Sequence, residues 1–282
     1  MSFIDQLKTL PQYLIPQHLL SVLVHKLMHL RLGGFTHWCI KKFIGLYKVD
    51  MSLAQEPDPH AYPFFNAFFT RALKADARPL AKTDFVSPVD GAISQIGQIK
   101  QGRIFQAKGH SFTATELLAT LPEHAAIFDE GLFTTVYLSP RDYHRIHMPV
   151  TGQLTKMTYI PGKLFSVNQR TVSVVPRLFA RNERLVCYFD TEYGQIALVL
   201  VGAIFVGSME TVWAGKITPP YTQDIKHWDY SKEDAPILQK GEELGRFNMG
   251  STIVLLTEAD KIIWADSLQS GSPVQMGQAL SQ

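Results

Sequence analysis

The feature that most constrains the fold of this chain is an apolar run from Ile196 to Val206, interrupted only by Gly202. Hydrophobic residues occupy successive positions of this run, so an extended segment would be apolar on both faces. A strand of this kind belongs in the middle of a sheet that is covered on both sides, and not at an edge. The run therefore predicts a buried β core.

The sequence after about Phe85 has a β-rich pattern throughout. Short segments of β-branched and aromatic residues are separated by Gly and Pro, which is typical of strands and turns. The expected strands are 93–99, 132–138, 153–160, 171–175, 185–189, 196–206 and 252–257. One helix is expected over 113–121, because Thr113 and Glu116 have the spacing of a capping box. Leu117, Leu118 and Leu121 would face inward.

The first 75 residues have a helical pattern instead. Between Pro16 and Gly33, apolar residues recur at helical spacing, and His18, Ser21, His25 and His29 lie on another face. Further helices are expected after Gly34 and over 64–73. Because no stretch of about 18 apolar residues occurs, we expect these helices to lie on a membrane and not to cross it. The alternative is that they pack on the protein's own core or on a partner subunit.

The charge pattern agrees with a membrane-surface role for the N-terminus. Residues 1–50 contain six Lys and Arg against two Asp, whereas the whole chain has a formal charge of only +2. The small net charge of the whole chain argues against nucleic acid as a partner. The basic N-terminal segment would be attracted to anionic lipid. Cys39 and Cys187 have no disulfide or metal-type spacing. With no secretory signal after Met1, we expect a reducing, cytosolic compartment.

The tripeptide Gly250-Ser251-Thr252 is the first chemical motif. Glycine leaves its carbonyl carbon unshielded and permits unusual backbone conformations, so a following hydroxyl can attack the preceding peptide bond. On these three residues alone, the ordinary interpretation is a turn before a strand.

Two other motifs supply the partners that such a serine needs. Asp90 lies in Ser-Pro-Val-Asp-Gly (87–91), and His144 and His147 lie in the segment 137–149. Asp, His and Ser together can form a relay in which a carboxylate orients an imidazole and the imidazole deprotonates the hydroxyl. The alternatives are that Asp90 is only a turn residue and that the two histidines bind zinc. No third metal ligand is marked by spacing, so no metal is expected.

With these motifs, the chain resembles the pyruvoyl-dependent phosphatidylserine decarboxylases of bacterial membranes over nearly its whole length. Further stretches that carry the resemblance are 65–71, 107–109, 164–168, 201–203, 206–208 and 240–245. The bacterial pattern commonly reads Leu-Gly-Ser-Thr, whereas Met249 takes the leucine position here. Leu and Met have similar volumes, so a packing role survives the exchange.

The resemblance implies an α+β fold, in which N-terminal amphipathic membrane-binding helices precede a mainly β catalytic core. Residues 1–75 would form the membrane-association region and residues 76–282 the catalytic domain, cleaved between Gly250 and Ser251. The implied partners are phosphatidylserine, a membrane surface and the two fragments of the chain as a heterodimer, with a homo-oligomer left open. The implied location is the cytoplasmic face of the bacterial inner membrane, as a peripheral protein.

The resemblance also implies the reaction, decarboxylation of phosphatidylserine to phosphatidylethanolamine and CO2. His147, oriented by Asp90, would take the Ser251 proton, and Oγ would attack the Gly250 carbonyl. Elimination from the ester and loss of ammonia would leave a covalent pyruvoyl cofactor at Ser251, which forms a Schiff base with the substrate amine. We expect His144 to be the general acid that protonates Cα.

Two other functions remain open from the sequence. A serine hydrolase would use Asp90, His147 and Ser251 as a lasting triad, although no Gly-x-Ser-x-Gly motif surrounds Ser251. A non-enzymatic membrane adaptor would need neither cleavage nor a reactive carbonyl.

Overall fold

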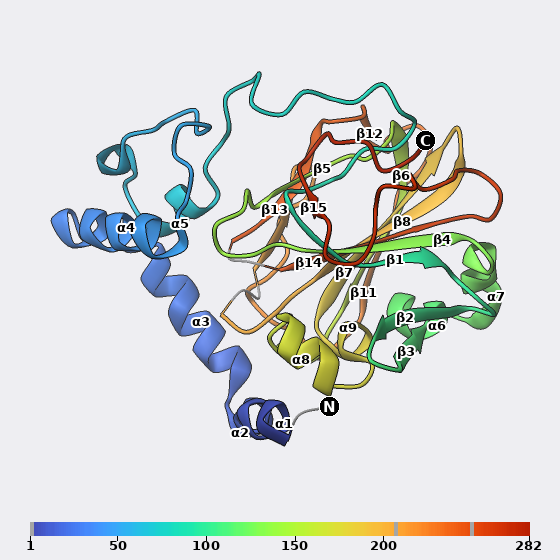
Figure 1. Cartoon of the computed structure of the whole chain (residues 1–282), viewed down its shortest axis with the longest axis horizontal. Helices are drawn as coiled ribbons and strands as arrows, with labels where there is room; N and C mark the ends of the chain where they lie inside the picture. The colour runs from blue at the N-terminus through green and yellow to red at the C-terminus, as the bar shows by residue number, and fades with distance from the viewer. Residues whose placement is uncertain (1–2, 206–207, 249–250) are drawn as a thin grey trace.

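The computed structural model describes residues 3–205, 208–248 and 251–282 of the chain. Five α-helices precede the first strand in the described part, and the remaining helices are short connections within the β region (Figure 1). The helices are α1 (Phe3–Thr9), α2 (Pro11–Leu14), α3 (Gln17–Met28), α4 (Gly34–Tyr47), η1 (Pro59–Ala61), α5 (Phe65–Phe69), α6 (Ala114–Leu118), α7 (Pro122–Ala125), η2 (Ala126–Phe128), α8 (Gln169–Val174) and α9 (Leu178–Arg181).

The strands form one large sheet, one small sheet and a hairpin. They are β1 (Gly91–Gln98), β2 (Arg103–Ala107), β3 (His110–Thr113), β4 (Leu132–Tyr137), β5 (Arg145–His147), β6 (Gly152–Ile160), β7 (Arg184–Thr191), β8 (Gly194–Val201), β9 (Met209–Thr211), β10 (Gly215–Lys216), β11 (Lys226–Asp229), β12 (Ile237–Leu238), β13 (Glu243–Phe247), β14 (Thr252–Thr257) and β15 (Pro273–Val274). The large sheet has nine strands in the order β11-β6-β7-β8-β14-β4-β1-β15, with β12 also on β6.

The centre of the large sheet is buried on both faces. On β8, Ile196, Leu198 and Leu200 contribute to one core cluster, and the alternate residues Ala197, Val199 and Val201 contribute to another. Strand β14 alternates in the same way. The predicted central strand is therefore confirmed, although β8 ends at Val201 and residue 206 lies outside the described residues.

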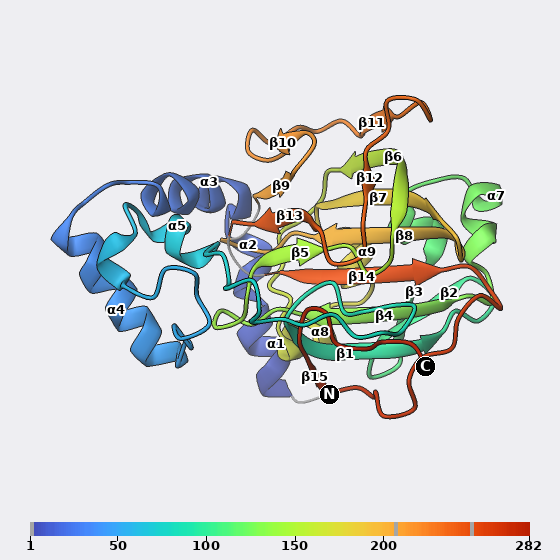
Figure 2. The same ribbon diagram turned by 90° about the horizontal axis from the view of Figure 1, so that it is seen from above.

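Helices α3, α4 and α5 lie beyond one end of the sheet strands, whereas α1 lies beside α8 (Figure 2). Phe68 of α5 packs with Ile40 of α4 in a small cluster of their own, which also includes Val49 and Tyr62. Because Phe68 and Phe69 are buried, this part of the expected 64–73 helix belongs to the protein interior. The fold is thus α+β, with a mainly β core, as predicted.

The prediction of a strand over 171–175 is wrong, because these residues lie in or directly after helix α8. The β-branched residues of this segment suggested a strand. However, the side chain of Asn168 accepts a hydrogen bond from the Thr171 backbone N–H at 3.0 Å and so caps a helix. A local cap has outweighed a weak strand propensity.

The capping box at Thr113 and Glu116 is confirmed, but its helix is shorter than predicted. Both reciprocal hydrogen bonds are present, and Leu117 and Leu118 are buried. Helix α6 ends at Leu118 because Ala119 adopts a left-handed conformation, and Leu121 is consequently exposed. The expected inward orientation of Leu121 is therefore wrong.

Candidate active site

Ser251 lies immediately before β14, where the sheet is most deeply buried. Its backbone carbonyl accepts a hydrogen bond from Leu138 N–H at 2.9 Å, and its hydroxyl donates to the carbonyl of Val201. The residue after it, Thr252, pairs with Tyr137 on one side and Val201 on the other. The backbone here is therefore held between two neighbouring strands, and Ser251 is fully buried.

His144 is fully buried just before β5 and has one free ring nitrogen. Its Nδ1 lies 2.8 Å from the Asp142 carbonyl, which can only accept, so Nδ1 carries the proton. Its Nε2 has no hydrogen-bond partner among the described residues. Burial lowers the pKa of His144 to about 3, so the ring is neutral near pH 7 and Nε2 presents a lone pair. The ring packs against Phe69, with centroids 4.1 Å apart.

His147, in contrast, uses both ring nitrogens. Nδ1 lies 2.8 Å from the Gly241 carbonyl, and Nε2 lies 3.0 Å from the Tyr143 hydroxyl. Burial is the main cause of the lowered pKa of His147. The ring is therefore neutral near pH 7, with Nδ1 donating and Nε2 accepting.

Asp90 is paired with an arginine. Arg78 donates through Nε and Nη2 to the two carboxylate oxygens at 2.9 and 2.5 Å, and the Met276 backbone N–H donates to Oδ1 at 2.8 Å. No hydrogen bond between Asp90 and His147 is described. The two residues are brought together through the backbone, because His147 N–H donates to the Pro88 carbonyl at 2.8 Å.

The small sheet brings both histidines beside the segment that leads into Ser251. Strand β5 pairs with β13, so that His147 lies opposite Glu243. Phe247 N–H donates to the His144 carbonyl at 3.1 Å, four residues before Ser251. His144 therefore bonds to a residue four positions before Ser251, whereas His147 lies opposite a residue eight positions before it. The predicted cleavage residue Gly250 lies outside the described residues, as does Met249.

An apolar cavity of about 240 Å³ adjoins this arrangement. Two of its wall residues contact predicted site residues: Leu138 bonds to the Ser251 backbone, and Phe69 packs on His144. The remaining wall consists of aromatic rings from α4 and β4 together with mostly apolar residues from the segments that contain residues 140, 166–168 and 203–205, namely Phe43, Tyr47, Tyr137, Pro140, Ser166, Val167, Asn168, Ala203, Ile204 and Phe205. We call this space the reaction cavity.

The residues present fit a carbonyl cofactor made from Ser251. Position 251 is enclosed, its backbone is held on both sides by strands, and the reaction cavity reaches the residue that bonds to it. The buried imidazole of His144, whose Nε2 has no partner among the described residues, packs against Phe69 of the cavity wall. For a metal the described residues offer no group of three His, Cys, Asp or Glu side chains.

The sequence analysis missed three residues that hold the predicted ones. Tyr143 bonds to His147, Arg78 pairs with Asp90, and Phe69 covers His144. Tyr143 lies in the same sequence motif as both histidines, so its phenol could have been identified as a hydrogen-bond partner of one of them. Arg78 lies in an irregular segment with no periodic pattern, and only the fold brings it to Asp90.

Comparison with known proteins identifies the family. A family model described as phosphatidylserine decarboxylase matches residues 65–282, and a second, described as PSD, matches residues 7–48. A phosphatidylserine decarboxylase proenzyme of Azotobacter vinelandii is 55% identical over 99% of this chain and 98% of its own length. The corresponding proenzyme of Ectopseudomonas mendocina is 56% identical over 98% of each chain. The chain therefore belongs to the phosphatidylserine decarboxylase family.

Proposed function

We propose that this protein is a proenzyme that cleaves itself and then decarboxylates phosphatidylserine to phosphatidylethanolamine and CO2. The observation that carries the proposal is the position of Ser251, which is fully buried beside an apolar cavity and held between two strands. A hydroxyl enclosed in this way is poorly placed for an ordinary surface reaction. Relatives named as proenzymes, at more than half identity over nearly full length, support the same conclusion.

In the proposed self-cleavage, Ser251 Oγ adds to the Gly250 carbonyl carbon and the peptide C–N bond breaks, which leaves an ester. His147 takes the hydroxyl proton, and Asp90 stabilises the cation that forms. In the structure, both ring nitrogens of His147 have hydrogen-bond partners, and Asp90 is bound to Arg78. The relay therefore requires the His147 ring to leave Gly241 or Tyr143 when the serine reacts.

In the proposed decarboxylation, a pyruvoyl group at position 251 supplies a ketone that condenses with the substrate amine and draws electrons from Cα as CO2 leaves. His144 Nε2 accepts a proton from the substrate ammonium, because it is the ring nitrogen whose lone pair is unused. Burial lowers the pKa of this ring and opposes the transfer, so the proposal requires the negative charge of the bound substrate to stabilise the imidazolium. The same atom returns that proton to Cα. The wall of the reaction cavity, rich in aromatic rings, keeps water away from this carbon.

The N-terminal helices support a membrane-surface location, because α3 presents its apolar side outward. Its polar residues face the protein: Gln17 accepts from Leu164 N–H at 2.7 Å, and Ser21 accepts from Phe205 N–H at 3.1 Å. The exposed side carries Leu19, Leu23 and Leu27. A helix that hides polar groups and exposes leucines is suited to an apolar environment. In the described part of the chain, no helix combines the length and hydropathy that crossing a membrane requires.

The proposed organisation follows from these features. Residues 1–75 form the membrane-association region, and residues 76–282 form the catalytic domain, whose two fragments remain together as a heterodimer. Strand β14, which follows Ser251, is paired with β4 and β8 on either side, and this supports continued association after cleavage. We place the protein on the cytoplasmic face of the inner membrane, because its basic N-terminal segment suits anionic lipid.

The proposal is tested by measuring conversion of phosphatidylserine to phosphatidylethanolamine in detergent micelles. We expect wild type to release CO2 and Ser251→Ala to release none, whereas the matched exposed variant Ser231→Ala should retain full activity. A Ser251→Ala protein that decarboxylates the lipid at the wild-type rate would contradict the proposal. Hydrolysis of the lipid without CO2 release would favour the serine hydrolase instead.

A further inference from the structure

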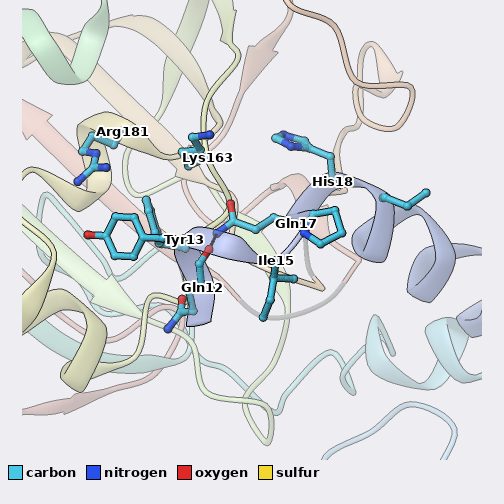
Figure 3. Close-up of a pocket in the computed structure, with 10 residues that line it drawn as sticks. Gln12, Tyr13, Ile15, Gln17, His18, Lys163 and Arg181 are labelled. Carbon is cyan, nitrogen blue, oxygen red and sulfur yellow. Dashed lines mark hydrogen bonds between the residues drawn. The ribbon is translucent and has the colours of Figure 1, made fainter. Parts of the chain in front are cut away.

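A second cleft lies between the first helices and the β core, apart from the reaction cavity (Figure 3). It has a volume of about 360 Å³ and is continuous in its lining with an adjoining space of about 640 Å³, since His18, Lys163 and Arg181 line both. Gln12 and Gln17 fix its helical wall, because they accept hydrogen bonds from the backbone N–H groups of Ser166 and Leu164. The cleft is therefore a built feature of the interface between α2, α3 and the core.

The cleft carries positive charge without a matching negative charge. Lys163 and Arg181 form no ion pair with a carboxylate among the described residues. The guanidinium of Arg181 lies over the rings of Phe165 and Tyr13, at 5.1 and 6.0 Å from their centroids. Glu183 lies 3.8 Å from His18 of the cleft. Burial raises the pKa of Glu183 to about 8, so this side chain is neutral near pH 7.

Hydrophobic side chains adjoin the same cleft on its outer side. Tyr13 and Leu14 of α2 and Leu19 of α3 are 50, 86 and 59% exposed. A ligand that satisfies both features has an anionic head and apolar tails. An inorganic anion would satisfy only the cations, and an apolar peptide would satisfy only the leucines.

We infer that this cleft binds the phosphodiester headgroup of an anionic membrane phospholipid, with Lys163 and Arg181 as the phosphate ligands. The acyl chains run outward over Leu14 and Leu19. The site is separate from the reaction cavity, with which it shares no lining residue. It holds a lipid that is not being decarboxylated and fixes the orientation of the catalytic core on the membrane.

Lysine footprinting on the full chain tests the site. The protein is acylated with an amine reagent, with and without dihexanoyl phosphatidylglycerol below its micelle concentration, and modification is followed by mass spectrometry. We expect the lipid to protect Lys163 severalfold and to leave Lys100 and Lys261 unaffected, because these two exposed lysines line neither the cleft nor the adjoining space. Inorganic phosphate at the same concentration should protect much less.

Variants assign the effect to the cleft. Near an anionic surface, each cation contributes about 1 kcal/mol, so Arg181→Gln should raise the lipid concentration for half-protection about fivefold. Arg177→Gln removes the same charge from the N-cap of α9 outside the cleft and should change nothing. If Arg181→Gln loses its native circular dichroism, Lys163→Gln is compared with Lys100→Gln for binding to phosphatidylglycerol vesicles, with the same fivefold expectation.

Three outcomes would overturn the inference: equal protection of all three lysines, no protection of Lys163, or equal protection by inorganic phosphate. The last would identify the ligand as a free phosphate. Phosphatidylglycerol lacks the carboxylate and amine of the proposed substrate, so none of these readouts depends on self-cleavage or decarboxylation. A failure of this site is thereby distinguishable from a failure of the proposed function.

Discussion

At the residue scale, the two histidines of one motif differ in what their rings can do. His147 has both nitrogens bonded, whereas His144 Nε2 is buried without a partner among the described residues. A buried, unpaired polar atom is costly and is retained where it has a function. The difference supports separate roles in cleavage and in decarboxylation, which the sequence motif alone suggests but does not establish.

Replacement of His144 tests that division of roles. We expect His144→Ala to be cleaved into two fragments as in wild type, and to lose decarboxylation by a factor of about 10² to 10⁴, typical of a missing general acid-base. Gel electrophoresis measures the first property, and CO2 release measures the second. His124→Ala, in the exposed segment of α7, is the control and should change neither. An uncleaved His144→Ala chain would show that the roles are assigned wrongly.

The Arg78–Asp90 pair is a second test at this scale. Both side chains are about nine-tenths buried, so removal of the guanidinium leaves an unpaired buried carboxylate. We expect Arg78→Ala to lower the free energy of unfolding by about 3 to 5 kcal/mol in urea denaturation. The control is Arg177→Ala, whose partner Glu116 is more exposed and whose loss should cost about 1 kcal/mol or less. Equal costs for the two variants would contradict this interpretation.

At the scale of single elements, the sequence predicted the strands well and one short segment poorly. Strands β1, β4, β6, β7, β8 and β14 overlap the expected ranges, because alternating or continuous apolar residues leave a strong periodic signal. Residues 171–175 were misassigned, since six residues are too few for a helical period to appear and the cap at Asn168 decided the outcome. Gly250-Ser251, Asp90 and the histidines could be found from motifs, but not their hydrogen-bond partners.

Glu183, which lies directly before β7, is a buried carboxyl 3.8 Å from His18 of α3. Tyr159 donates to its carboxyl at 2.8 Å, and burial raises its pKa from 4.5 to about 8. At a pH between 4.5 and about 8, the Glu183 carboxyl is ionised in the unfolded chain and protonated in the folded chain. The unfolded state therefore binds fewer protons, and stability falls as pH rises through this range.

The buried carboxyl of Glu183 predicts a pH dependence of stability. From pH 5 to 8, the free energy of unfolding should fall because of Glu183 by up to about 1.4 kcal/mol per pH unit, and Glu183→Gln should remove that slope. Urea denaturation at several pH values measures it. Glu192→Gln, at an exposed position, should keep the wild-type slope. An unchanged slope in Glu183→Gln would mean that the buried carboxyl is ionised in the folded protein.

At the scale of the whole molecule, the arrangement combines an enclosed reaction site with an exposed apolar surface. Helices α3, α4 and α5 lie at the end of the sheet where β14 begins (Figure 2), and rings of α4 form part of the reaction cavity wall. In the proposed organisation, this side faces the membrane, and the lipid substrate enters the cavity from there without full exposure to water. The amphipathic pattern predicted the helices, but only the fold shows which side they expose.

Polar substitutions on this surface test the membrane assignment. We expect the pair Leu14→Ser and Leu19→Ser to weaken binding to phospholipid vesicles at least tenfold, since each leucine gains about 1.5 kcal/mol or more from burial in an apolar phase. The control pair, Leu121→Ser and Ile263→Ser, removes two apolar side chains that are also more than half exposed but lie outside the N-terminal helices, and it should leave binding unchanged. Equal weakening by both pairs would contradict a dedicated membrane surface. Flotation through a density gradient measures the bound fraction.

The central claim is that Ser251 changes chemically when the chain cuts itself. Intact-mass analysis of the freshly purified, active protein measures this directly. We predict fragments of 250 and 32 residues, since 282 − 250 = 32, the smaller with a blocked N-terminus that gains two hydrogens on borohydride reduction. A single 282-residue chain that retains the Ser251 hydroxyl and still decarboxylates phosphatidylserine would contradict the account.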